Sequence, residues 1–593
     1  MLRVMLLALG LCFSVSAGHK DVQLPVLNWV KLSDWHSVKD YGARGDGKTD
    51  DSAAIQKLYD MASRGKVKAI YFPPGKYRIT KTLTLKNQKG LYIVGHGRDT
   101  VLFWDGKKGG SIYLSNGIHR SRYEGIVYDG RGIARICAEH SSQKRYETSV
   151  SYKNCAFMNA DYGVAISRNK RKFASAEFHY ENIIFKNTKT GLLLNEFNDY
   201  DHFLEGCVFI NNDIGIHSHK GHSNVRNSHF FGSRIVDVRI SKPQHPGSLR
   251  LCTSEGSNMF FETGGIAPEG EDSVAEGRNW MQSYAIQGCR IRNWKNKKAA
   301  VILRQLGPTM FFDNFFSDGP GQSVPVATGH DKNTAVIVSS NNLLNGKPFA
   351  VKSSGKLELI EIPATSASPK PGTAMPWFFK STVKVPKKVF DAKVDFGAVG
   401  NARVDDSDAI IKTIAAAKKY GKGALAYIPA GKYKITKQLK IDGTDYVIAG
   451  SGKLTNLQWS GKYETPIVHV IDPQNIKISN MVIGSVYEGK KVHRKLSNGK
   501  KEGLNSFFKN RTAADKATEQ RGVTKILQTS NGKSSSINYD GLFLYNVYNH
   551  APGIELRRLP RGSKVRIGKM NGALILNDSG QAEMLCTLHL GRM

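Results

Sequence analysis

Ionisable side chains that could transfer a proton are concentrated between residues 196 and 239. A carboxylate next to an imidazole holds one tautomer and raises the basicity of the ring, so His217 beside Asp237 could act as a general acid or base. Three further carboxyl groups are candidates for proton transfer: Glu196, Asp201 and Glu205. Five side chains could bind a carboxylate or sulfate group of a ligand: Arg239, Arg226, His219, Lys220 and His222.

Four apolar segments predict the strands that would position these residues. Residues 163–167, 191–195, 215–219 and 235–239 align on their alternating apolar side chains. Because alternate residues of a strand point to opposite faces, the alignment places His217 beside Asp237 and His219 beside Arg239 on an exposed groove. An error of one residue in the register would bury all four side chains.

A second alignment predicts the corners between strands. Asn154, Asn182, Gly206 and Asn227 follow one another at intervals of 28, 24 and 21 residues, which fits one β-helix coil each. Asn and Gly tolerate the left-handed backbone conformation that a tight corner needs. We therefore expect these four residues to stack in one corner column.

The residue before each corner belongs to a predicted outward column of charges: Lys153, Glu181, Glu205 and Arg226. One interpretation is a ladder of salt bridges between neighbouring coils. The other interpretation is that Glu181 and Glu205 are catalytic carboxylates. The sequence leaves both interpretations open.

A long segment of the chain occurs twice. Residues 38–55 return as residues 394–410, and residues 72–81 return as residues 428–437. This cassette resembles the entry segment of the pectate-lyase-like superfamily, and its tandem arrangement is similar to that of secreted exo-β-1,3-glucanases. The resemblance implies an all-β fold with two tandem right-handed parallel β-helices, each entered through a short capping helix. Helix capping then accounts for Asp50, Asp51 and Ser52 without a catalytic role.

The repeat divides the chain into four predicted parts. Residues 1–17 combine Arg3, an apolar run and a small-residue cleavage site, which is typical of a secretory signal peptide. Residues 18–360 form the first β-helix and 361–389 a linker. Residues 390–593 form a second, shorter β-helix with a basic loop at 490–533. We expect a secreted protein, extracellular or periplasmic if bacterial, without a membrane span.

Charge and cysteine usage indicate the kind of partner and the redox chemistry. The formal net charge of +35 at pH 7 attracts polyanions, and export favours an anionic polysaccharide, so no nucleic acid is expected. Cys155, Cys207 and Cys289 recur in one context and are interpreted as buried thiols rather than disulfides. No short Cys/His spacing predicts a metal site. The oligomeric state is unknown from the sequence.

Two reactions on an acidic glycan remain open. Hydrolysis needs two carboxyl groups that flank the glycosidic bond, one of them protonated. β-Elimination needs a base and cations that stabilise enolate-like charge, and His217 with Arg239 suits this role. No cofactor is expected, and Ca²⁺ would serve only a lyase, for which no compact Asp cluster exists. The alternative is a non-catalytic basic β-helix that binds anionic cell-wall or matrix polysaccharide.

Overall fold

The computed structural model describes residues 22–586 apart from the following segments: 143–144, 168–174, 197, 243–244, 265–282, 305–307, 330–334, 350, 354–355, 366–367, 369, 373–384, 463–464, 486–522, 545–552, 569, 572–573, 578 and 580–581. The predicted signal peptide and most of the predicted basic loop, residues 490–522, lie outside the described residues. Within the described part of the chain, no helix is long and apolar enough to cross a membrane.

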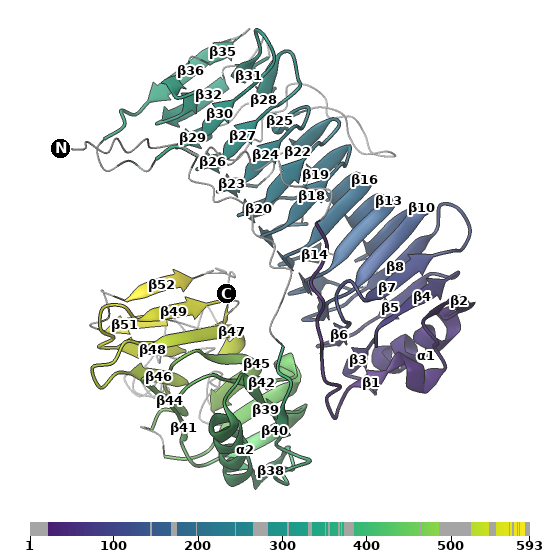
Figure 1. Ribbon diagram of the computed structural model, residues 1–593, viewed down its shortest axis with the longest axis vertical. Coiled ribbons are helices and arrows are strands. Elements are labelled where there is room, and N and C mark those ends of the chain that lie inside the picture. Colours follow the sequence, from purple (N-terminus) through teal and green to yellow (C-terminus); the bar gives the residue numbers. More distant parts are fainter. Residues whose placement is uncertain are drawn as a thin grey trace, which may run out of the picture.

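Strands from the first part of the chain wind into a parallel β-helix, which we call the first unit (Figure 1). One face is a 13-stranded sheet in which neighbouring strands come from successive coils. Its strands, in sheet order, are β1 (His36–Ser37), β3 (Ala69–Tyr71), β6 (Tyr92–Val94), β9 (Arg122–Glu124), β12 (Ser151–Lys153), β15 (His179–Glu181), β17 (His202–Glu205), β20 (Ser223–Arg226), β23 (Gly247–Arg250), β26 (Tyr284–Gln287), β29 (Thr309–Phe312), β32 (Ala335–Ser340) and β36 (Leu357–Glu361).

The other faces of the first unit form one connected set of strands. These are β2 (Asp46–Asp50), β4 (Gly75–Ile79), β5 (Leu83–Lys86), β7 (Thr100–Trp104), β8 (Ser111–Asn116), β10 (Val127–His140), β13 (Ala156–Ile166), β16 (Ile184–Leu194), β18 (Val208–Ile210), β19 (Ile214–Ser218), β21 (His229–Phe231), β22 (Val236–Ile240), β24 (Thr253–Glu255), β25 (Phe261–Thr263), β27 (Arg290–Arg292), β28 (Ala299–Leu303), β30 (Phe315–Ser317), β31 (Val324–Thr328), β33 (Leu343–Leu344), β34 (Lys347–Pro348) and β35 (Lys352–Ser353). A separate pair is β11 (Glu147–Thr148) with β14 (Ser175–Ala176).

The remaining strands form a shorter set of coils, which we call the second unit. Its 11-stranded sheet contains β37 (Val389–Asp391), β38 (Asn401–Asp405), β39 (Ala424–Ile428), β40 (Gly431–Ile435), β42 (Tyr446–Gly450), β43 (Thr455–Trp459), β45 (Ile476–Ser485), β47 (Ser536–Leu544), β49 (Lys564–Ile567), β50 (Met570–Asn571) and β52 (Glu583–Cys586). Its five-stranded sheet contains β41 (Leu439–Ile441), β44 (Val468–Ile471), β46 (Ile526–Thr529), β48 (Ile554–Arg557) and β51 (Leu574–Asn577).

One α-helix enters each unit, α1 (Ser52–Ser63) in the first and α2 (Ser407–Tyr420) in the second, so the all-β fold with two short entry helices is confirmed. The expected cap is different in detail. Asp51 makes no side-chain capping bond; its carboxylate instead accepts hydrogen bonds from the backbone N–H groups of Arg44 and Gly45, at 2.7 and 3.1 Å. In the second unit, the Asp406 carboxylate likewise accepts hydrogen bonds from the backbone N–H groups of Val399 and Gly400. These buried carboxylates therefore fix the glycine turns and are structural.

The predicted corner column is confirmed. Asn154, Asn182, Gly206 and Asn227 have φ values of 50°, 54°, 63° and 46°, and the Asn182 amide donates to Asn154 Oδ1 at 3.3 Å. Left-handed backbone is costly for most residues, but the short polar side chain of Asn bonds locally and reduces this cost.

The prediction of interior thiols is confirmed too. Cys155 and Cys207 are buried and free. Each lies directly after a corner residue and points into the coil, and burial raises the pKa of both thiols to about 12. Phenylalanine rings stack along the same core, with 4.8 Å between the centroids of Phe185 and Phe209. Both thiols therefore stay protonated beside the stacked rings of the core.

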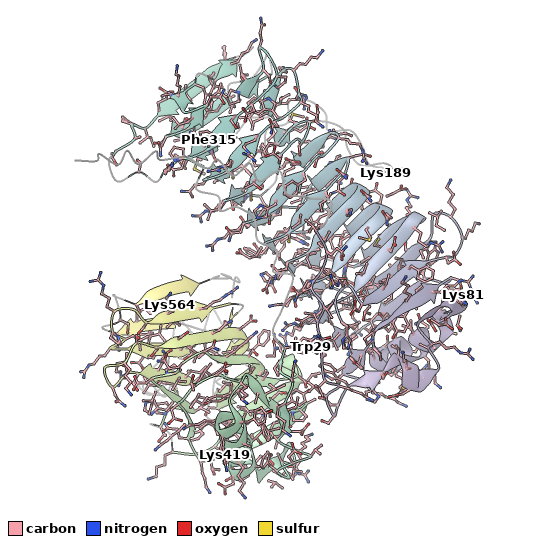
Figure 2. The ribbon with its side chains drawn as sticks, in the orientation of Figure 1. Trp29, Lys81, Lys189, Phe315, Lys419 and Lys564 are labelled. Atoms are coloured by element: carbon pink, nitrogen blue, oxygen red, sulfur yellow. The ribbon has the colours of Figure 1, made fainter. Side chains whose placement is uncertain are left out.

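The two units contact each other at the end where both entry helices lie, and they diverge toward their later strands (Figure 1). An apolar cluster joins them, and it contains residues at the same position of each repeat, such as Tyr71 of β3 and Tyr427 of β39. Trp29, labelled in Figure 2, packs against this cluster. Asp34 completes the junction by accepting hydrogen bonds from the Tyr427 hydroxyl, the Ala430 N–H and the Ser451 hydroxyl at 2.6, 3.0 and 2.8 Å.

Candidate active site between the two units

Three charged side chains form an outward column on the 13-stranded sheet. Lys153 of β12, Glu181 of β15 and Glu205 of β17 are paired by register on successive coils. The residue that precedes each of them is buried in the core, so alternation along the strand directs these three side chains outward. The predicted column is therefore present.

The second unit supplies the opposite wall through β45, β47 and β49. One cavity of about 60 Å³, enough for a few water molecules, is lined by both units. Its lining residues are Lys153, His179, Glu181, Glu205, Lys477, Asn538, Asp540, Arg566 and Gly568. Three carboxyl groups and three cationic side chains thus face one space at the junction.

Ion pairs within each wall order these groups. Lys153 Nζ lies 2.8 Å from Glu181 Oε1, and Lys477 Nζ lies 3.4 Å from Asp540 Oδ2. Arg122 also joins the two units, because its guanidinium donates across the junction to Asn480 Oδ1 at 2.6 Å. The salt-bridge interpretation of the column is correct for Lys153 with Glu181 and for Arg226 with Glu205.

The pKa values of two carboxyl groups are lowered. Burial alone would raise the pKa of Glu181, but the ammonium group of Lys153 outweighs it and lowers the pKa to about 2. Burial also opposes ionisation of Asp540, yet Lys477, Lys153 and Arg122 together hold its pKa below the usual range. Both groups are ionised at neutral pH.

Glu205 differs from its two neighbours. Burial raises its pKa, and the negative charge of Glu181 adds to the shift. The Asn227 amide, which donates to Glu205 Oε1 at 2.7 Å, and Arg226, 4.0 Å from Oε2, only partly offset this effect. Carboxyl groups whose pKa values are driven apart are suited to separate acid and base roles.

The predicted groove around His217 is different in the structure. His217 pairs with Arg239, not with Asp237, because β22 is shifted by two residues against the alignment. His217 is 3% exposed and bonded to Ser241 Oγ at 2.6 Å, and burial followed by the charge of Arg239 lowers its pKa well below 6.5. His219 is also buried, and its ring lies 6.3 Å from that of His217. The prediction of an exposed His217–Asp237 pair is therefore wrong.

The predicted partners of these histidines have other neighbours. Arg239 pairs with the buried Glu262 at 2.5 Å, and Glu262 also pairs with Arg304. Asp237 is fully buried, accepts from the Ser254 hydroxyl at 2.5 Å, and has its pKa raised to about 7 by burial. Neither Arg239 nor Asp237 faces an open groove.

The remaining predicted residues form two pairs at the ends of strands. Lys220 Nζ lies 4.0 Å from Glu196 Oε1, and His222 Nε2 lies 3.5 Å from Asp201 Oδ1. Of the predicted site residues, only Glu205 and its neighbour Arg226 belong to the column at the junction.

The alignment missed the second-unit residues Lys477, Asn538, Asp540 and Arg566. The alternation of residues 536–544 would have marked Asn538 and Asp540 as outward, because Ile537 and Tyr539 are core residues. What these side chains face depends on the docking of two coils, for which the local sequence carries no signal. Within the described residues, no group of three His, Cys, Asp or Glu side chains is arranged to hold a metal ion.

Several known proteins resemble parts of the chain. Alginate lyase 7 of Azotobacter vinelandii is 34% identical over 147 residues, which are 22% of this chain and 16% of that protein. A probable glucan endo-1,3-beta-glucosidase of Arthroderma benhamiae is 48% identical over 66 residues, 11% of this chain and 7% of that protein. The chain thus spans less than a fifth of either relative.

Among solved structures, the catalytic unit of the GH87 alpha-1,3-glucanase from Streptomyces thermodiastaticus aligns with 60% of this chain and 72% of its own. The TM-score is 0.34 and the identity 12%. The family model described as Rhamnogalacturonase A/epimerase, pectate lyase-like matches residues 35–241 and 390–544. Because these two stretches exceed half of its length, the chain belongs to the Rhamnogalacturonase A/epimerase, pectate lyase-like family.

Proposed function

We propose that the protein is an exported enzyme that cleaves an acidic polysaccharide at the junction between its two units. The observation that carries this proposal is the shared cavity, where Glu205 has a raised pKa while Glu181 and Asp540 have lowered ones. The names of the relatives support a polysaccharide as the substrate. The cationic side chains of both walls would attract an anionic polysaccharide.

Hydrolysis is the reaction that this arrangement supports best. Glu205 would protonate the glycosidic oxygen as general acid, because its raised pKa increases the fraction of the carboxyl group that is protonated at neutral pH. Asp540, held ionised, would act on the other side of the bond as base or nucleophile. Lys153 and Arg566 would bind the anionic groups of the sugar.

β-Elimination is the second candidate, and the cations favour it. An ionised carboxylate could remove the proton next to a uronate carboxyl group, and Lys153 or Lys477 would stabilise the enolate-like charge. The two reactions differ in their products, since only elimination creates an unsaturated uronate that absorbs ultraviolet light.

Product analysis on a polysaccharide panel tests the proposal. We expect new reducing ends without new ultraviolet absorbance, and absorbance would indicate elimination instead. The Glu205→Gln variant should lose activity by about 10²-fold or more, which is typical of a missing general acid. Glu255→Gln is the matched control, because Glu255 pairs with Arg292 on another strand set and should leave activity unchanged. Binding without any product would favour the adhesion alternative.

A further inference from the structure

The outward column that contains Glu205 continues beyond the cavity. Register pairs Glu205 with Arg226, Arg226 with Arg250, Arg250 with Gln287, and Gln287 with Phe312. The residue before each of these four is buried in the core, so all four side chains point outward. Arg250 is exposed, whereas Arg226, Gln287 and Phe312 are half-buried.

The spacing of this column matches a linear glycan. Neighbouring strands lie about 4.8 Å apart, so the four steps from Glu205 to Phe312 span roughly 19 Å. A pyranose residue extends a glycan chain by nearly the same length as one step. A chain lying along the column would therefore place successive sugars over successive coils.

The order of the side chains favours a charged glycan near the cavity. Arginine pairs with carboxylate or sulfate through two parallel hydrogen bonds. Arg250 has no carboxylate partner within the described part of the chain, so its guanidinium is available to a ligand. The amide of Gln287 can bond sugar hydroxyls from either side. The Phe312 ring offers a large apolar contact surface for the apolar face of a sugar.

We propose that Arg226, Arg250, Gln287 and Phe312 form a binding track for a linear glycan that carries anionic groups on neighbouring sugars. The track binds the chain on one side of the cleavage point and leads it to Glu205. This proposal rests on the proposed function for its direction, because Glu205 defines where the track ends. Binding along the track does not require turnover.

Chain length separates the track from general charge attraction. For a long polygalacturonate, Arg250→Ala should raise KM about tenfold with kcat nearly unchanged, since binding to a charged group is lost and the reacting groups are intact. For a disaccharide, which is too short to reach Arg250 from the cavity, the same variant should have an unchanged KM. Arg292→Ala removes an equal charge from another strand set and should change neither value. Equal effects of both variants on KM would overturn the track.

Binding to the Glu205→Gln variant tests the track without catalysis. Titrations use polygalacturonate, carrageenan and uncharged dextran, which distinguish carboxylate from sulfate as the recognised group. Adding Arg250→Ala should weaken binding of the recognised polyanion about tenfold. Phe312→Ala should weaken the binding of the same polyanion without changing the salt dependence of this binding. Retained binding in both variants would refute the track, whereas track-dependent binding in a wild-type protein that forms no product would refute only the proposed function.

Discussion

At the residue scale, the carboxyl groups at the junction predict a pH profile for the proposed reaction. The rate should fall as pH rises through the raised pKa of Glu205, because the acid must hold a proton. It should fall on the acidic side as Asp540 and Glu181 are protonated. The positive charge of Lys153 lowers the pKa values of Asp540 and Glu181. The Lys153→Met variant lacks this charge, so the acidic limb of its kcat/KM profile should move to higher pH. Lys189→Met, at a residue remote from the cavity, is the control. An acidic limb that does not move in Lys153→Met would show that Asp540 and Glu181 do not determine it.

Asp237 predicts a pH dependence of stability. Its pKa is about 7 in the folded protein and near 3.8 unfolded, so the folded state binds the extra proton between these values. The free energy of unfolding should therefore decrease as pH rises from about 4 to about 7, by up to about 4 kcal/mol. Asp237→Asn should flatten this part of the curve, as measured by urea unfolding midpoints at pH 5 and pH 8. A variant that keeps the wild-type slope would show that another group titrates.

At the scale of the elements, the corner residues support the coils. Asn182 has a φ of 54° and bonds to Asn154. Asn182→Val should lower the free energy of unfolding by about 2 kcal/mol, because a β-branched residue is strained in left-handed backbone. Asn182→Gly should cost less, since glycine adopts this conformation freely. Thermal unfolding of both variants measures the difference, and equal losses would mean that the hydrogen bond rather than the backbone matters.

The same elements show how much the sequence predicts. The alternation of inward and outward side chains correctly predicts the Lys153 column, because each of its strands ends at a corner residue of recognisable type. The same rule wrongly predicts that Asp237 is exposed. Strand β22 begins on one face and continues on another: Val236 lies in an outer apolar cluster, and Val238 lies in the core. Apolar alternation cannot distinguish these two surroundings. The docking of the units, which brings Asp540 opposite Glu181, depends on contacts between distant parts of the chain.

At the scale of the whole molecule, Asp34 links the alignment of the units to activity. Its carboxylate accepts three hydrogen bonds from the second unit. Asp34→Ala leaves the Ala430 N–H and two hydroxyl groups without this partner, which should cost about 3 kcal/mol. We expect faster proteolysis between the units and a lower kcat, because the two walls of the cavity would no longer be held together. Asp40→Ala, at an exposed pair with Lys31, is the control.

The overall charge predicts how the protein approaches the proposed acidic polysaccharide. Binding of an acidic polysaccharide should weaken steeply with added salt, since exposed charges are screened beyond about 10 Å at 0.1 M. Affinity measured across a salt series tests this expectation. Binding that is insensitive to salt would point to hydrogen bonds and stacking as the main source of affinity.

The junction also has a consequence for how such a chain arises. Tyr71 and Tyr427 occupy one position of the repeat, as do Val94 and Ala449, and all four belong to the same apolar cluster. Contact through like positions is the hallmark of an isologous dimer with two-fold symmetry. Fusion of two such protomers makes the partner permanent and removes the need for identical halves. Each wall of the shared space is then free to diverge, so one copy can keep a long 13-stranded sheet while the other shortens to a supporting wall.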